Sequence, residues 1–471
     1  MKTKAVASLV IISAMMAASF AAPAWSDTPQ PDAASPSVPS RGGILALSGR
    51  LTQNKIFAGG DGSVVLELSL TADRIAAPVP ESRRAVDMVV VLDRSGSMAG
   101  RKLNNAGRAI ADLIGRLSER DRFALVSYAG TVRRHTPLLP ATTAHRSRLL
   151  TEVAQIEAGG GTNLGAGLEM GMALLKSAPK RSGLGRLILI SDGLANKGIV
   201  DPAALGRRAA DAREYGFAVS TVGVGDDFNE TLMTTLADRG AGTYYYLANP
   251  AVFAEVFQQE LRGMFAVAAT SVTVTVPLNG GVALIDASGY PVEVLGRTAV
   301  FHPGDLRSGQ TRRFFLTLQV PARAGARFWV RDIAAAYTHD GRRYAARLPD
   351  LFEIACVTDP AAAMASIHKS AWERKVLQED YGRLKRQVAD DIRSGRAPEA
   401  MEKIRKYRSR QEAANAVVGS AKVDANLDEE VLQLEATVQE TFSGPADQVQ
   451  AKQKRAAKAL QFESYKERRS K

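Results

Sequence analysis

Hydrophobic residues follow two alternating patterns through the middle of the chain. Short continuous apolar runs are typical of strands that are buried on both faces of a parallel sheet. Between these runs, apolar residues recur at three- and four-residue steps, which is the spacing of an amphipathic helix. The alternation predicts a doubly wound, Rossmann-like α/β domain over residues 83–266, with helices on both faces of the sheet. The expected strands are residues 86–92, 123–128, 187–190, 217–224 and 244–247.

A different pattern, in which apolar and polar residues alternate one by one, occurs on both sides of this α/β domain. It is typical of strands with one buried face. It is present in residues 42–82 and returns in residues 267–358, where Asp340-Gly341 marks a hairpin turn. We expect residues 267–358 to form a β-sandwich that the N-terminal β segment completes, so that the α/β domain is inserted in it or flanked by it.

The last part of the chain, residues 359–471, is predicted to be a helical region with a basic tail. Apolar residues at heptad-like spacing form one stripe in residues 377–392 and another in residues 427–438. The first stripe fits a partner-binding or oligomerising coil and a local helical bundle equally well. Residues 452–471 are mostly polar and basic, and such a run is usually solvated.

The N-terminus carries a targeting pattern. Lys2 and Lys4 precede an apolar stretch that ends in small residues, which predicts a secretory signal peptide over residues 1–26. A linker rich in proline and serine follows over residues 27–41. We therefore expect export to the periplasm or the cell exterior, with membrane anchoring as the alternative if the stretch is not cleaved. Cys356 is the single cysteine, which excludes an intramolecular disulfide, and its apolar neighbours predict a buried strand position.

Composition and charge narrow the classes of partner. The chain has 471 residues, of which 45% are hydrophobic and 23% charged, and this is typical of a globular protein with several domains. A formal net charge of +12 favours acidic partners or an acidic envelope surface. No zinc-finger spacing and no basic run interleaved with aromatic residues is present, so we expect no nucleic-acid partner.

Candidate chemistry lies at the ends of the predicted strands. Asp93, Ser95 and Ser97 directly follow the first strand of the α/β domain, and Asp192 follows a later one. Thr162 ends a glycine-rich loop between them. Ligands of open α/β sheets bind at the carboxyl ends of the strands, so we expect these residues to meet at one rim.

Their oxygen atoms are the hard ligands that Mg²⁺ prefers. Two carboxylates offset the charge of the metal, and neutral hydroxyls leave it electrophilic toward one further oxygen. A carboxylate presented by a partner protein is the natural last ligand. Mg²⁺ is the expected metal, with Mn²⁺ or Ca²⁺ as alternatives. Since nothing in the pattern activates a nucleophile, we expect no enzyme activity, no catalytic residue and no organic cofactor.

These residues resemble the von Willebrand factor A domain and its metal-ion-dependent adhesion site, whose pattern is D-x-S-x-S followed by a distant T and a distant D. The resemblance covers about residues 86–265, and the strand-flanked arrangement is similar to exported bacterial members and to the inter-alpha-trypsin-inhibitor heavy-chain type. It implies that the serines and the threonine contact the metal directly and that the aspartates act largely through water. It also implies that the last helix, near residues 252–264, couples to the state of the metal and its ligand.

Other motifs have simpler interpretations. The loop 159–165 lacks the Gly-Lys-Ser/Thr ending of a P-loop, and neither Ser95 nor Ser97 stands in a G-x-S-x-G motif. Residues 226–230 could bind a second cation, but a helix cap is favoured, and residues 244–246 are expected in a strand rather than a ligand platform. No H-E-x-x-H motif is formed by the five histidines, His135, His145, His302, His339 and His368.

The leading hypothesis is a divalent-metal-dependent protein-binding or adhesion module of the periplasm or cell exterior. The alternative is a cell-envelope scaffold or assembly factor that acts through its C-terminal helices and has a structural metal site. A third hypothesis, a partner of a cytosolic ATPase, is disfavoured by the signal peptide.

Overall fold

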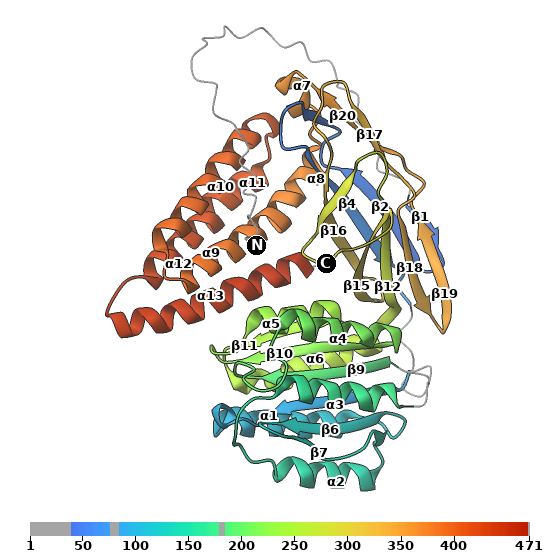
Figure 1. Cartoon of the computed structure of the whole chain (residues 1–471), viewed down its shortest axis with the longest axis vertical. Helices are drawn as coiled ribbons and strands as arrows, with labels where there is room; N and C mark the ends of the chain where they lie inside the picture. The colour runs from blue at the N-terminus through green and yellow to red at the C-terminus, as the bar shows by residue number, and fades with distance from the viewer. Residues whose placement is uncertain (1–38, 76–83, 179–183, 470–471) are drawn as a thin grey trace.

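The computed structural model describes residues 39–75, 84–178 and 184–469. The predicted signal peptide and most of the predicted linker lie outside these residues. The α/β domain lies at one end of the molecule, and the other β sheets and the C-terminal helices lie side by side at the other (Figure 1). Among the described residues, no helix combines the length and the apolar character needed to cross a membrane.

The α/β domain is built on one sheet with the strand order β11-β10-β9-β5-β6-β7, and β8 pairs with β6 outside this path. All neighbours from β11 to β6 are parallel, whereas β7 and β8 pair with β6 in the antiparallel direction. The strands are β5 (Val86–Asp93), β6 (Arg122–Tyr128), β7 (Val132–Arg134), β8 (Leu139–Pro140), β9 (Leu184–Ser191), β10 (Phe217–Val224) and β11 (Ala241–Leu247).

Helices cover both faces of this sheet, and each face has its own apolar core. The first core contains buried residues of α1 (Arg101–Arg116), α2 (Thr143–Ala154) and α6 (Phe253–Phe265). The second contains those of α3 (Leu164–Lys176), α4 (Pro202–Glu214) and α5 (Glu230–Arg239). The alternating pattern of the sequence therefore predicted the doubly wound α/β fold correctly.

The flanking β segments form two five-stranded sheets and a three-stranded sheet within the described residues. β4 pairs with β16, so strands from before and after the α/β domain lie in one sheet. Buried side chains of all these sheets belong to one apolar cluster. The first five-stranded sheet has the order β1 (Ser40–Gly42), β2 (Leu45–Leu51), β4 (Ser63–Ala72), β16 (Thr311–Gln319) and β13 (Ala283–Ala287). The second has the order β14 (Glu293–Leu295), β15 (Thr298–Arg307), β12 (Val267–Pro277), β18 (Ala334–His339) and β19 (Arg342–Arg347). The three-stranded sheet has the order β17 (Arg327–Val330), β20 (Phe352–Val357) and β3 (Lys55–Phe57).

Two local predictions in this region are confirmed. β18 and β19 form the expected hairpin, and its turn residues Asp340 and Gly341 have φ angles of 46° and 74°. Both angles lie in the left-handed region that a tight hairpin turn of this kind requires. Cys356 lies in β20 with 3% of its surface exposed and has a free thiol.

The C-terminal region is helical, as predicted. Its two apolar stripes are buried against each other in one cluster, as in a local bundle. The π-helical turns Lys375–Asp380 and Asn426–Glu430 interrupt the helices. The helices are α7 (Pro360–Met364), α8 (Lys369–Arg374), α9 (Tyr381–Arg393), α10 (Ala397–Val418), α11 (Ala421–Ala425), α12 (Val431–Thr441) and α13 (Ala446–Arg469).

The expectation of a solvated basic tail holds only in part, because Lys454, Arg455 and Lys466 are exposed whereas Lys458 and Arg468 are buried. The basic run forms most of α13, which lies between the other C-terminal helices and the α/β domain (Figure 1). Tyr465 of α13 is 3% exposed and belongs to the core on the α5 face of the α/β domain. Lys458 and Arg468 are buried with the helix. Their positive charges are stabilised there because acidic and carbonyl groups of distant elements lie beside them.

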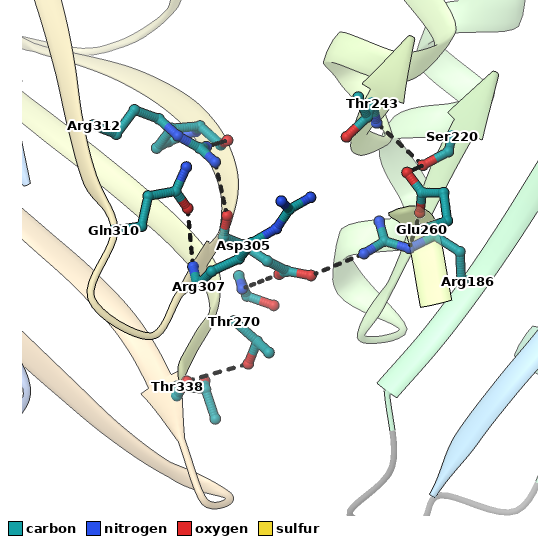
Figure 2. Close-up of polar contacts among 12 residues, drawn as sticks. Arg186, Ser220, Thr243, Glu260, Thr270, Asp305, Arg307, Gln310, Arg312 and Thr338 are labelled. Atoms are coloured by element: carbon teal, nitrogen blue, oxygen red, sulfur yellow. Dashed lines mark hydrogen bonds and ion pairs between the residues drawn. The ribbon is translucent and has the colours of Figure 1, made fainter. Parts of the chain in front are cut away.

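A buried polar network joins the α/β domain to the β sheets at the end opposite the carboxyl ends of the strands (Figure 2). Arg186 of β9 pairs with Glu260 of α6 at 3.3 Å and with Asp305 of β15 at 3.5 Å. Ser220 and Tyr245 both donate hydrogen bonds to the Glu260 carboxylate. The network therefore links the sheet, α6 and the neighbouring β15 through one guanidinium.

Candidate metal centre

The two candidate carboxylates start from neighbouring strands. Asp93 is the last residue of β5, and Asp192 follows the last residue of β9. The two strands are parallel and paired, with Leu92 opposite Ile190. Both carboxylates therefore reach the same rim of the sheet, and both are 0% exposed.

Hydrogen bonds connect these carboxylates to the candidate serines. Asp93 accepts from the backbone N–H of Ser95 at 2.8 Å and from the hydroxyl of Ser191 at 2.9 Å. Ser97 donates its hydroxyl to Asp192 Oδ1 at 2.7 Å, and the hydroxyl oxygens of Ser95 and Ser97 lie 3.1 Å apart. Four of the five predicted residues thus form one connected cluster.

The glycine-rich loop brings Thr162 to the same place. Its backbone is fixed to the loop after β5, because Gly159 N–H donates to the Arg94 carbonyl at 2.8 Å and Gly96 N–H donates to the Gly160 carbonyl at 3.2 Å. Gly160 has a φ of 79°, which glycine adopts without strain.

The Thr162 side chain faces the same point as Ser97. A Cβ built on Gly193, next to Asp192, would lie 3.6 Å from the Ser97 hydroxyl oxygen and 3.9 Å from that of Thr162. Asn196 holds the threonine backbone from the other side, since its side-chain oxygen accepts from Thr162 N–H at 2.9 Å. The structure therefore brings all five predicted residues together.

The electrostatics of this cluster fit a divalent cation. Burial raises the pKa of the Asp93 carboxyl, hydrogen bonds from Ser95 and Ser191 lower it, and the nearby Asp192 carboxylate raises it. Two buried carboxylates at one point need positive charge beside them. Hard oxygen donors from two carboxylates and three hydroxyls are the ligand type of Mg²⁺ and similar cations.

Lys102 is a member of the site that the sequence pattern did not indicate. It lies in the first turn of α1 and donates to Asp192 Oδ2 at 2.5 Å, and its side chain is 29% exposed. Ser191 was also missed, although its position beside Asp192 at the end of a strand could have indicated it. For Lys102, the only sequence feature that could have indicated a place near the site is that its helix begins directly after the D-x-S-x-S segment.

We expect Lys102→Met to bind divalent cations more tightly than the native chain. The substitution removes a positive charge that contacts a carboxylate of the site while retaining the apolar stem. A partly exposed charge pair of this kind contributes roughly 1 kcal/mol, which corresponds to an increase in affinity of about fivefold. Isothermal titration with Mn²⁺ measures the change, and an unchanged or weaker affinity would show that Lys102 does not oppose cation binding.

The alternative motifs of the sequence have structural roles. Asn229 caps α5, since its side chain accepts from Leu232 N–H at 3.0 Å, and residues 244–246 lie in β11. Each of the five histidines is held by contacts with residues outside the cluster. These contacts are His135 with Ser127 and Glu152, His145 with the carbonyl of Phe123, His302 with Thr273, His339 with the carbonyl of Ala268, and His368 with Arg50.

The α/β domain thus combines a doubly wound fold with a cluster of oxygen ligands at its strand ends. This combination indicates the class of protein to which the domain belongs. Residues 87–259 match the model of the von Willebrand factor type A domain. This part of the chain is therefore a von Willebrand factor type A domain, as the residue pattern predicted.

Individual relatives match mainly this domain. The chain is 32% identical to the uncharacterized protein YfbK of Escherichia coli over 212 residues, which are 45% of this chain and 36% of that protein. It is 29% identical to inter-alpha-trypsin inhibitor heavy chain H4 of Sus scrofa over 194 residues, 39% of this chain and 21% of that one. The chain thus spans less than half the length of these relatives.

Two solved structures resemble nearly the whole chain. A von Willebrand factor type A protein from Catenulispora acidiphila has a TM-score of 0.67 at 19% identity, covering 91% of this chain and 97% of that one. The ArnB paralog VWA2 from Sulfolobus acidocaldarius has a TM-score of 0.53 at 15% identity, covering 89% and 99%. At these identities the likeness shows a common fold and nothing about function.

Proposed function

We propose that the chain is an exported protein-binding or adhesion module that depends on a divalent metal. The observation that carries the proposal is the convergence of two buried carboxylates and three hydroxyls from three separate segments at one strand-end rim. Mg²⁺ is the proposed metal, held by Asp93, Ser95, Ser97, Thr162 and Asp192. Von Willebrand factor A domains often mediate protein–protein interaction or adhesion, which supports the same function.

The carboxylates and the hydroxyls around the metal would have different roles in binding it. Asp93 and Asp192 supply negative charge, and their hydrogen bonds with Ser191 and Ser97 fix the carboxylate planes. The hydroxyls supply neutral oxygen, so that the bound cation keeps an excess of positive charge. Because Ser97 is exposed while Asp93 is fully buried, the open side of the cluster is the side of the serine. A carboxylate from a partner would approach from there and complete the coordination shell.

Nothing in this cluster supports catalysis. The hydroxyls of Ser95 and Ser97 contact each other and a carboxylate, and no histidine base lies beside them among the described contacts. We therefore propose a binding function without turnover.

The proposal is tested by capturing partners from an envelope extract on the immobilised full chain. Capture is expected in Mg²⁺, with loss in EDTA and loss with Thr162→Ala in Mg²⁺. The matched control is Thr151→Ala, which removes an exposed hydroxyl from the outer face of α2 and should capture as the native chain does. Capture of the same proteins by the native chain in EDTA and by Thr162→Ala would contradict a metal-dependent function.

A further inference from the structure

The loop between β10 and α5, residues 225–229, lies between the metal centre and the C-terminal helices. On the side of the metal centre it faces Lys102. A Cβ built on Gly225 would lie 3.6 Å from both Cε and Nζ of Lys102. The same ammonium donates to Asp192, so Lys102 lies between the loop and a carboxylate of the site.

On its other side, this loop is held by basic side chains of α13. Lys454 donates to Asp227 Oδ1 at 2.8 Å, and Arg455 reaches Asp226 at 3.4 Å. Lys458 donates to the carbonyl of Phe228 at 2.6 Å, and its ammonium lies 3.8 Å from the centre of the Phe228 ring. α13 therefore contacts three consecutive residues of the loop.

Aromatic residues fix α13 on the neighbouring edge of the sheet. Phe462 packs edge-on against Tyr244 and Tyr246 of β11, at centroid distances of 5.8 and 6.0 Å. The hydroxyl of Tyr465 accepts from Tyr244 N–H at 3.0 Å. Since Tyr246 donates its hydroxyl to Asp226 at 2.7 Å, the anchor and the loop are one connected structure.

A buried ion pair lies at the centre of this contact. The Lys458 ammonium is 3.8 Å from the Glu230 carboxylate, and both side chains are less than a tenth exposed. Burial raises the pKa of Glu230 to about 7 and lowers that of Lys458 to about 8. Such desolvated groups are kept together only while α13 remains in place.

The loop and the metal centre also interact electrostatically. Lys454 lowers the pKa of the Asp227 carboxyl most strongly, and the positive charge of Lys102 contributes to the same lowering. Asp227 thus lies within the electrostatic reach of Lys102 on one side and of α13 on the other. Lys458 contacts the loop, the loop lies next to Lys102, and Lys102 donates to Asp192.

We infer that α13 is a positioning element of the metal centre: it holds the 225–229 loop against Lys102 and thereby keeps the Lys102 ammonium beside Asp192, where it opposes cation binding. This inference rests on the proposed metal site. A released loop lets Lys102 withdraw, so loosening α13 raises the cation affinity. By reciprocity, a bound cation displaces Lys102 toward the loop and loosens α13.

The test is a double-mutant cycle in the full chain with Mn²⁺ as the probe. Glu230→Gln with Lys458→Met loosens α13 without changing the net charge, and Phe462→Ala loosens it through the aromatic anchor alone. Each is measured in the native and in the Lys102→Met background by isothermal titration. The matched control is Lys466→Met, an exposed residue of α13 whose described contact is the Phe462 ring at 5.4 Å. Thermal unfolding verifies that every variant is folded.

In the native background we expect both loosening variants to bind Mn²⁺ about threefold more tightly, a typical size for coupling between contacting groups. In the Lys102→Met background we expect no further change, because the residue through which α13 acts is gone. Saturating Mn²⁺ should also speed hydrogen exchange in residues 458–465 of the native chain.

The possible outcomes separate the two proposals. If the native chain binds no Mn²⁺, the proposed metal site and the proposed role of α13 are both wrong. If the native chain binds Mn²⁺ but the loosening variants bind it equally well, only the role of α13 is overturned. If the variants gain the same affinity with and without Lys102, α13 acts by another route and the positioning role is wrong.

Discussion

Asp93→Ala abolishes measurable binding of Mg²⁺ and Mn²⁺ if the strand-end cluster is the metal site. The substitution removes one of two carboxylates that offset the charge of the cation. It also removes the acceptor that orients the Ser95 backbone and the Ser191 hydroxyl. Groups that orient metal ligands typically contribute tenfold to 100-fold in affinity, and loss of the carboxylate itself should exceed this. Isothermal titration of the folded variant measures the loss.

Two controls accompany this experiment. Asp112→Ala removes an exposed carboxylate from α1, outside the cluster, and should bind as the native chain does. Asp93→Asn keeps the shape of the side chain and removes only its charge, so it should bind weakly while unfolding near the native temperature. Native affinity in Asp93→Ala would mean that the cation binds elsewhere.

Arg186→Met is expected to cause the largest loss of stability. Arg186 lies between Glu260 and Asp305 (Figure 2). The side chains of Arg186 and Glu260 are 9% and 3% exposed. Burial raises the pKa of the Asp305 carboxyl, and the Arg186 guanidinium counteracts it. Removing the shared cation leaves two carboxylates without it, and breaking a buried pair in this way costs about 3–5 kcal/mol. Urea denaturation followed by tryptophan and tyrosine fluorescence measures the change.

The cause of this loss can be checked with a second substitution. Adding Glu260→Gln to Arg186→Met removes one unpaired charge but keeps an acceptor for the hydroxyls of Ser220 and Tyr245. The double variant should therefore regain part of the lost free energy of unfolding. If Arg186→Met and the native chain unfold at the same midpoint concentration of urea, the network does not stabilise the junction between the α/β domain and β15.

The α/β domain was predictable because its pattern is strong and local. A continuous apolar run such as residues 88–92 is typical of a strand buried on both faces, and the structure places it in a central strand of the sheet. The cluster was predictable for a related reason. Asp93 and Asp192 each follow a parallel strand, and the carboxyl ends of such strands share one rim.

Lys102 could not be predicted in the same way. A lysine in the first turn of an amphipathic helix is normally a solvated residue, and its partner Asp192 is 90 positions away in the sequence. Only the packing of α1 on one face of the sheet brings the two together. Arg186 presents the same difficulty, since its two partners belong to α6 and to a strand beyond the α/β domain.

The packing of α13 against the α/β domain could not be predicted from its composition. Its composition is that of a solvated basic run, yet Lys458 is 7% and Arg468 9% exposed. Their burial depends on Glu230, on the Phe228 and Ser288 carbonyls and on aromatic rings. A charge count carries no information about such distant partners. Likewise, the pairing of β4 with β16 depends on strands separated by the entire α/β domain.

The most direct test of the central claim is a crystal structure of the chain grown with Mn²⁺, with anomalous diffraction to locate the metal. If this cluster is the metal site, one strong anomalous peak is expected among the hydroxyl oxygens of Ser95, Ser97 and Thr162, beside the carboxylates of Asp93 and Asp192. No peak in this cluster, or a metal bound only elsewhere on the chain, would contradict it.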